Sequence, residues 1–196
     1  MPADPDAAAE LRSWSGQEDT TVDLSGLDAS GVDLTDADLG MGLFSESRLV
    51  DAVLVGTDLY RAHLENAVLE RADLSRSSLV KAVLDGASLR SAVLIEADLG
   101  SADLADVDAR SASFRAARLN GATFVDVHLE GADLSDASVA QTSFEVFLDE
   151  HTAVCGLSGT VYGPARVDED GSHRELAGRD LESWLNSRGA SVQVLN

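Results

Sequence analysis

Residues 62–106 read AHLEN AVLER ADLSR SSLVK AVLDG ASLRS AVLIE ADLGS ADLAD when they are written in groups of five. The same register runs without a slip through 25 groups, whose central residues lie five apart from Leu24 to Phe144. The central residue is Leu in 18 groups and Phe in four, and the residue two positions earlier is Ala in 15. Because a fixed internal period is the signature of a repeat architecture, it determines the fold prediction.

A period of five fits neither a regular helix nor a regular strand. Within a group, however, the two apolar positions are two residues apart, as in Ala72-Asp73-Leu74, which is the alternation of an extended segment. The other two residues, such as Ser75-Arg76, are small or polar and suit a turn. Short extended segments joined by corners cannot bury their leucines locally, so the chain must coil and stack on itself as a solenoid.

Several groups share the sequence Ala-Asp-Leu and resemble the pentapeptide-repeat family. They are Ala37-Asp38-Leu39, Ala72-Asp73-Leu74, Ala97-Asp98-Leu99, Ala102-Asp103-Leu104 and Ala132-Asp133-Leu134. The resemblance covers residues 22–146 and implies an all-β fold, a right-handed quadrilateral β-helix with four groups per coil. In that fold the central residue and the small residue before it point inward. Twenty-five groups then form about six coils.

Both flanks of the repeat are expected to act as caps, because the ends of a solenoid expose apolar surface and strand edges. Residues 1–21 are predicted to be an N-terminal cap, with one short helix that follows Asp6 as its N-cap, or a disordered segment.

Residues 147–196 are predicted to be a strand-helix-strand module. Its expected elements are a strand over 159–167 interrupted by Gly163-Pro164, a turn at 169–171, a helix over 179–187 and a strand over 191–195. Leu181, Trp184 and Leu185 share one face of this helix and are the candidate dimerisation residues. The sequence leaves open whether the module forms a homodimer or only covers the last coil.

The chain carries 35 acidic and 14 basic residues, a net charge of −21. Direct binding to nucleic acid or to a membrane surface is disfavoured, because both depend on clusters of Lys and Arg. A basic protein partner remains open. The single Cys155 cannot form an internal disulfide, and no secretory signal or long apolar stretch occurs, so a cytoplasmic location is expected.

The unbroken register also assigns each charge to a side of the rod, because every fourth group lies on the same side. The groups centred on Leu24 and on every twentieth residue after it carry eight outward acids and no Lys or Arg. We call this side the acidic face and predict that it binds the partner. Its acids are Asp23, Glu46, Glu65, Asp85, Asp103, Asp106, Asp126 and Glu145.

No catalytic site, metal site or cofactor is predicted. The chain has no G-x-S-x-G, P-loop, dinucleotide-binding or H-E-x-x-H motif. Its four histidines have no metal-ligand spacing with one another or with Cys155; they are His63, His128, His151 and His173. The repeated Asp residues recur because the turn recurs. Four outward aliphatic residues form a small contact patch or merely reflect strand propensity: Val53, Val55, Val93 and Ile95.

The family resemblance implies a function as well as a fold. The best understood members are acidic rods that resemble duplex DNA and bind bacterial type II topoisomerases, chiefly DNA gyrase; several protect the enzyme from quinolones or natural toxins. The expected function is therefore a non-enzymatic DNA mimic that binds gyrase or another basic DNA-binding protein, in antibiotic resistance or self-immunity. The alternative is a scaffolding repeat protein with an unrelated protein partner. This chain lacks the long loop that interrupts the coils of some protecting members.

Overall fold

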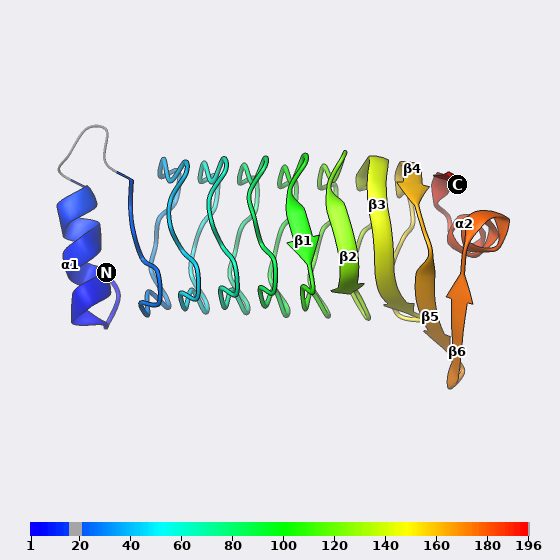
Figure 1. The fold of residues 1–196 in the computed structure, drawn as a ribbon, viewed down its shortest axis with the longest axis horizontal. Coiled ribbons are helices and arrows are strands. Elements are labelled where there is room, and N and C mark those ends of the chain that lie inside the picture. Colours follow the sequence, from blue (N-terminus) through cyan, green and yellow to red (C-terminus); the bar gives the residue numbers. More distant parts are fainter. Residues whose placement is uncertain (16–20, 196) are drawn as a thin grey trace.

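The computed structural model describes residues 1–15 and 21–195 of the chain. It is a rod with one helix at each end (Figure 1). The elements in chain order are α1 (Pro5–Trp14), β1 (Asp103–Ala105), β2 (Thr123–His128), β3 (Ser138–Asp149), β4 (Ser158–Tyr162), β5 (Ala165–Glu169), β6 (Ser172–Leu176), α2 (Gly178–Ser187) and β7 (Ser191–Leu195).

The body of the rod is a coil that gains one layer every 20 residues. Parallel bridges connect residues 20 apart, from Asp23 and Leu43 at one end to Asp133 and Ala153 near the other. Twenty residues are four groups of five, so each layer has four sides, and the β-helix class expected from the period is confirmed. The 20-residue register continues past residue 146, where Ser138 pairs with Ser158.

Regular strands occupy only the C-terminal part of this coil. Strand β1 pairs with β2, β2 with β3 and β3 with β4, all in parallel, whereas the earlier layers are joined by isolated bridges. Regular strands therefore form only about three turns of the solenoid instead of all six expected coils, and isolated bridges join the earlier layers. The reason is the corner in every group of five, which leaves most extended segments too short to be strands.

The corners have a backbone conformation that the sequence pattern does not show. The last residue of every group from Gly26 to Gln141 has a φ between +54° and +70°. The first amide of the next group donates to the central carbonyl, as from Leu27 N to Leu24 O at 3.0 Å, which is the arrangement of a type II turn. Glycine suits this position best, but residues such as Lys81 occupy it as well.

The interior is filled by the two inward positions of each group. Leu64, Leu84 and Leu104 are fully buried. Ala62 and Ala102, two residues before Leu64 and Leu104, are fully buried as well. Gly42 is the smallest residue at this position because a Cβ there would lie 2.5 Å from the Phe44 ring. Phe114, Phe124 and Phe144 follow Ala or Thr at this position, so Gly42 is a local adjustment to Phe44, and the core is continuous from one layer to the next.

Helix α1 covers the N-terminal end of the coil with its buried Ala7 and Leu11. The helix begins at Pro5 with Asp4 as its N-cap, so the prediction of Asp6 as the N-cap was wrong; Asp4 Oδ1 instead accepts the Asp6 amide at 2.8 Å. The amides of Asp23 and Asp28 belong to the first coil. Their equivalents in the next layer donate to carbonyls of the preceding coil, as Leu43 N does to Val22 O. The first coil has no preceding coil. Carboxylates of α1 and of its N-cap take the place of that coil: Glu10 Oε1 accepts from Asp23 N, and Asp4 Oδ2 accepts from Asp28 N, each at 3.3 Å. The predicted cap is therefore partly described, while residues 16–20 lie outside the described residues.

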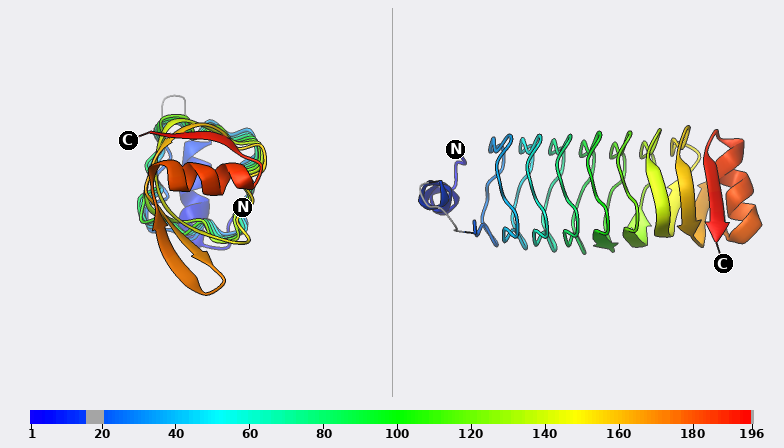
Figure 2. Two further views of the ribbon diagram at one scale, coloured as in Figure 1. Left: turned by 90° about the vertical axis from the view of Figure 1, so that its right-hand side faces the viewer. Right: turned by 90° about the horizontal axis from the view of Figure 1, so that it is seen from above.

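The C-terminal end is closed by β7 and α2. Strand β7 pairs in parallel with β4 as a further layer, and α2 lies across that end of the rod (Figure 2). The candidate dimerisation residues Leu181, Trp184 and Leu185 are 0%, 7% and 0% exposed in the single chain. Because they already pack against this chain's own core, their burial supports the capping alternative.

The predicted strand over 159–167 is two strands, β4 and β5, separated at Gly163-Pro164. Strand β5 pairs in parallel with β3 and antiparallel with β6. The β5–β6 hairpin projects beyond the outline of the rod (Figure 2).

Between β2 and β3 the register shifts by one residue, so that Val127 pairs with Val146 and His128 with Phe147. Val146 consequently points inward and is 2% exposed, although the period places it outward.

Candidate acidic binding face

The coil register brings the eight predicted acids to one side of the rod. One column of bridged residues runs from Asp23 through Leu43, His63 and Val83 to Asp103, and it continues through β1, β2 and β3. Five of the acids are exposed, namely Asp23, Glu46, Asp103, Asp106 and Glu145. The remaining three are half-buried, namely Glu65, Asp85 and Asp126. The face is therefore a continuous strip of carboxylates on stacked layers.

Hydrogen bonds hold some of these carboxylates in their ionised form. Glu65 Oε2 accepts from Ser45 Oγ at 2.8 Å, and Glu65 Oε1 lies 3.0 Å from His63 Nδ1. Burial raises the pKa of the Glu65 carboxyl, but the bonds from His63, from its own backbone and from Ser45 prevail and hold that pKa below its usual value. The Ser25 hydroxyl and amide lower the pKa of Asp23 in the same way. Both residues are therefore anions at neutral pH.

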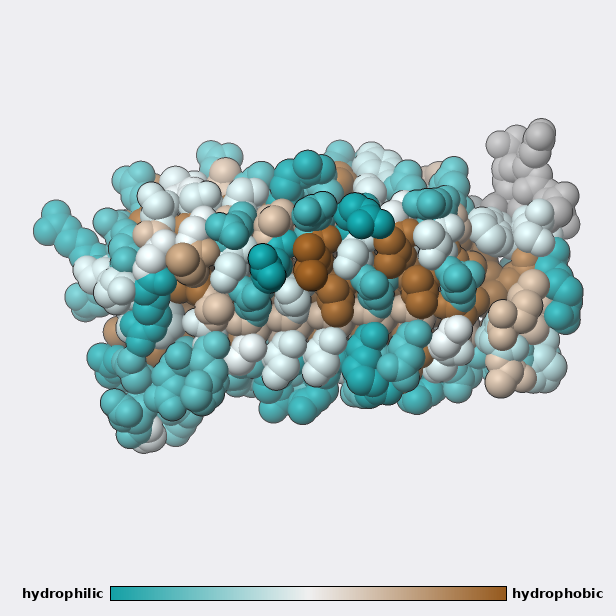
Figure 3. Space-filling view, turned by 180° about the vertical axis from the view of Figure 1, so that it is seen from behind, coloured by the Kyte–Doolittle hydropathy of each residue, from teal (hydrophilic) through white to brown (hydrophobic). Residues whose placement is uncertain are grey.

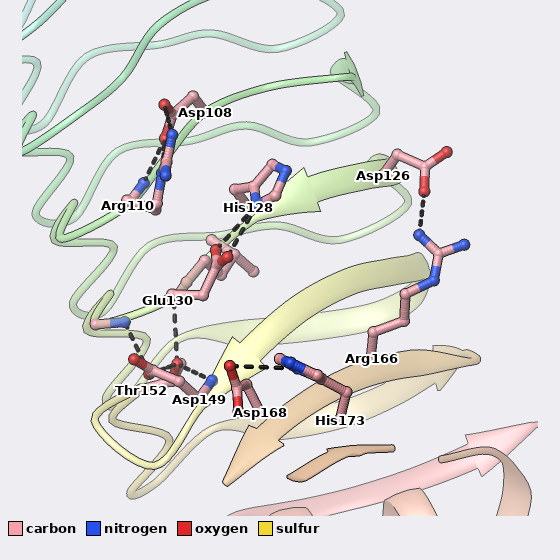
Figure 4. A network of polar contacts seen from close by, with 12 residues as sticks. Asp108, Arg110, Asp126, His128, Glu130, Asp149, Thr152, Arg166, Asp168 and His173 are labelled. Atoms are coloured by element: carbon pink, nitrogen blue, oxygen red, sulfur yellow. Dashed lines mark hydrogen bonds and ion pairs between the residues drawn. The ribbon is translucent and has the colours of Figure 1, made fainter. Parts of the chain in front are cut away.

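The acidic face has one basic neighbour that the period does not reveal. Arg166 on β5 reaches it, and Arg166 Nη1 lies 2.8 Å from Asp126 Oδ1 (Figure 4). The count of bases along the repeat missed this arginine because the hairpin lies outside the register. The prediction of a face free of Lys and Arg is thus wrong at Asp126. Among the described residues, the six acids from Asp23 to Asp106 form no ion pair with Lys or Arg.

Several acids on other sides of the rod form ion pairs with arginines of the same layer or of a neighbouring one. Arg71 Nε lies 2.7 Å from Asp51 Oδ1, one coil below. Asp108 is contacted by Arg110 at 2.5 Å and by Arg90 at 3.0 Å. The hydrogen bond from Arg110 is the main reason that the pKa of Asp108 lies far below its usual value. These arginines neutralise Asp51 and Asp108, whereas the carboxylates from Asp23 to Asp106 have no Lys or Arg partner among the described residues.

The other candidate residues form no catalytic or metal constellation in the described parts of the chain. Each histidine lies beside a single carboxylate, as His128 does beside Glu130 at 2.9 Å (Figure 4). No group of three His, Cys, Asp or Glu residues within 1–15 and 21–195 is placed to hold a metal ion. In the same ranges, no helix has both the length and the apolar character to cross a bilayer.

The outward aliphatic residues of the suggested contact patch are half-buried: Val53, Val55, Val93 and Ile95. On the side of the rod seen in Figure 3, apolar side chains lie along the middle of the rod, interrupted by hydrophilic ones. The apolar residues on that side therefore form a narrow, interrupted band.

A coil of four-sided layers, filled by Leu and Ala at fixed positions of a five-residue period, defines a β-helical repeat protein. A model of the family of pentapeptide repeats matches the chain in eight copies, over residues 47–86, 67–106 and 112–145. The chain belongs to the pentapeptide-repeat family.

Solved structures with a similar fold come from several organisms. One is QnrB1, a plasmid-mediated fluoroquinolone resistance protein, at 13% identity over 88% of this chain and 86% of that one, with a TM-score of 0.42. A pentapeptide repeat protein from the thylakoid lumen of Arabidopsis thaliana is 31% identical over 58% of this chain and 77% of its own, with a TM-score of 0.34. Rfr23 from the cyanobacterium Cyanothece 51142 is 22% identical over 74% and 97% of the two chains, with a TM-score of 0.35. A search of curated proteins finds no match.

Proposed function

We propose that this protein is a non-enzymatic acidic rod that binds a type II topoisomerase, DNA gyrase, on the surface where that enzyme binds DNA. The observation that carries the proposal is the run of acids from Asp23 to Asp106 on stacked layers, without Lys or Arg partners among the described residues. The choice of gyrase rests on the family, whose best understood members bind this enzyme.

The physical basis is the replacement of phosphates by carboxylates. Successive layers of a β-helix lie about 4.8 Å apart, and six acids lie on the layers from Asp23 to Asp106, so their spacing approaches the ~3.4 Å per phosphate of one DNA strand. Carboxylates accept charge-assisted hydrogen bonds from Arg and Lys as phosphates do. Because the six acids have no Lys or Arg partner among the described residues, and only Glu65 lies beside a histidine, few existing contacts must be broken when a partner binds.

The test is a supercoiling assay with purified gyrase, with and without a fluoroquinolone. In the variant Glu46→Lys/Asp103→Lys/Asp106→Lys we expect the effect of the protein on gyrase to be lost. These three side chains are exposed, so the substitutions change charge without removing core packing. Circular dichroism verifies that the β-helix is retained.

The matched control is Asp36→Lys/Glu96→Lys/Asp136→Lys. These acids are also exposed, occupy corner positions, and lie on the side of the rod opposite the acidic face. The change in net charge is the same, so a loss confined to the first variant identifies the acidic face as the contact. Equal loss in both variants would show that the effect on gyrase depends on the net charge of the protein and not on the acidic face. If the unsubstituted protein neither inhibits gyrase, nor protects it, nor co-migrates with it, the gyrase proposal is wrong. The scaffolding function then remains.

A further inference from the structure

A groove of about 410 Å³ lies where the β5–β6 hairpin leaves the side of the rod. It is on the column that contains Asp108 and His128, next to the acidic face; none of the eight acids of that face lines the groove, although Arg166 of the groove pairs with Asp126. Half-buried Phe147 supplies its exposed apolar surface, Leu148 and Val167 also line it although each is only 1% exposed, and the remaining lining residues are acidic or basic. The lining residues are Phe147, Leu148 and Val167 on the floor, and Glu130, Arg166, Asp168, His173, Arg174 and Glu175 on the rim.

The floor is preformed by the one-residue register shift between β2 and β3, which turns Phe147 outward. The His128 ring stacks on Phe147 with 4.3 Å between ring centroids and 6° between ring planes. The Arg166 guanidinium lies 4.8 Å from the centre of the same ring. Both contacts restrict the position of the Phe147 ring at the base of the groove.

The basic residues of the rim are neutralised by acids that do not line the groove. Arg166 pairs with Asp126 at 2.8 Å, and Arg174 pairs with Glu169 at 2.6 Å. Both acids lie outside the lining set.

Three rim carboxylates therefore remain without a Lys or Arg partner of their own among the described residues. Glu130 and Asp168 lie beside the imidazoles of His128 and His173, at 2.9 and 3.3 Å, and Glu175 forms no ion pair there (Figure 4). An acidic rim above an apolar floor complements a cation on an apolar stem. Arginine fits best, since its planar guanidinium can bond a carboxylate with two parallel N–H groups while its stem covers apolar surface.

The edge of the hairpin offers a place for the main chain that would carry this arginine. In the described part of the chain, β6 pairs only with β5, so its outer edge has unpaired amides and carbonyls. His173 and Glu175 lie on β6 opposite Asp168 and Arg166, and they line the groove. An extended segment added to this edge could therefore direct a side chain toward the groove.

We propose that this groove binds an arginine side chain from an extended segment of a partner protein, at a site separate from the acidic face. The proposal does not require that the partner be gyrase.

The experiment is an NMR titration of the full isotope-labelled chain with a blocked, otherwise uncharged peptide that contains one arginine. Identical peptides with lysine or the neutral citrulline in its place serve as ligand controls. We expect saturable shifts confined to β5, β6 and the surroundings of Phe147, weaker binding of the lysine peptide, and none of the citrulline peptide. Asp168→Asn/Glu175→Gln should weaken arginine binding about fivefold or more.

The matched protein control is Glu46→Gln/Asp103→Asn, which removes the same charge from the acidic face. It should leave binding in the groove unchanged. Shifts centred on the acidic face, equal binding of the citrulline peptide, or an undiminished affinity of the groove variant would each overturn the proposal. The gyrase assay above is independent of these outcomes, so the two proposals can fail separately.

Discussion

Two serines at the same position of their groups differ in hydrogen bonding and should respond in opposite ways to replacement. Ser47 and Ser77 are 0% and 1% exposed and point into the core. Ser77 Oγ donates to Leu74 O at 2.7 Å, whereas Ser47 Oγ has no hydrogen-bond partner among the residues that the structure describes. Since Ala is the usual residue here, we expect Ser47→Ala to raise the free energy of unfolding and Ser77→Ala to lower it.

The magnitudes follow from the two environments. A buried hydroxyl without a partner costs about 1–3 kcal/mol, part of which is offset by the contacts that its oxygen makes, so Ser47→Ala should stabilise the fold by about 1 kcal/mol. Ser77→Ala removes a bond with a net value of about 1 kcal/mol. The Leu74 carbonyl keeps its bond from the Ser77 amide at 3.1 Å, so no further penalty is expected. The two variants should therefore differ by about 2 kcal/mol.

Thermal and urea unfolding followed by circular dichroism measure this difference. For a chain of this length, about 1 kcal/mol shifts the melting temperature by about 2–4 °C, so the two melting temperatures should be separated by about 5 °C. Thr57→Val is a second reference, because Thr57 Oγ1 donates to Leu54 O at 2.7 Å; it should follow Ser77→Ala. The reasoning is refuted if Ser47→Ala is less stable than the unsubstituted protein.

Three further predictions concern the core, the C-terminal cap and pH. Gly42→Ala should lower the free energy of unfolding by about 1–3 kcal/mol through overpacking, because its Cβ would lie 2.5 Å from the Phe44 ring and 2.8 Å from Leu39 O. Calorimetry should show partial recovery in Gly42→Ala/Phe44→Leu, and no recovery would contradict the role of the Phe44 ring. Trp184→Ala should cost about 3–5 kcal/mol without changing the mass measured by light scattering, and a change of mass would instead place Trp184 in a dimer interface. Asp108 has a pKa depressed chiefly by Arg110, so its contribution to stability is present above the unfolded pKa of about 3.9 and is lost as pH falls through the folded pKa. Asp108→Asn should therefore be less stable than the unsubstituted protein at pH 7, and the deficit should shrink at pH 3 in urea unfolding; an unchanged deficit would refute this assignment.

The period predicted the class of fold and the direction of most side chains in the coil. Leu64 and Leu84 are buried and Glu65 points outward because each occupies a fixed position in the group. The unbroken register also predicted that Glu46 and Asp106, 60 residues apart, lie on one face. Such predictions succeed because each layer repeats the same local turn and the same bonds to the next layer.

The ends of the rod were predictable only in outline. The helix of the C-terminal module was expected from its apolar spacing, but whether Trp184 faces solvent or core depends on how α2 packs on the last layers. The bond from Asp23 N to Glu10 exists because the first coil has no layer below it, and no sequence pattern gives that distance.

The sequence by itself therefore determined the repeating part of this protein: the coil, its Leu and Ala interior, and the side on which each repeat acid lies. Only the tertiary structure decided that Arg166 neutralises Asp126 and that Phe147 turns outward beside His128. The physical reason is that a repeated unit carries its environment in its own register, whereas the hairpin and the two helices are positioned by non-repeating contacts between residues far apart in the chain.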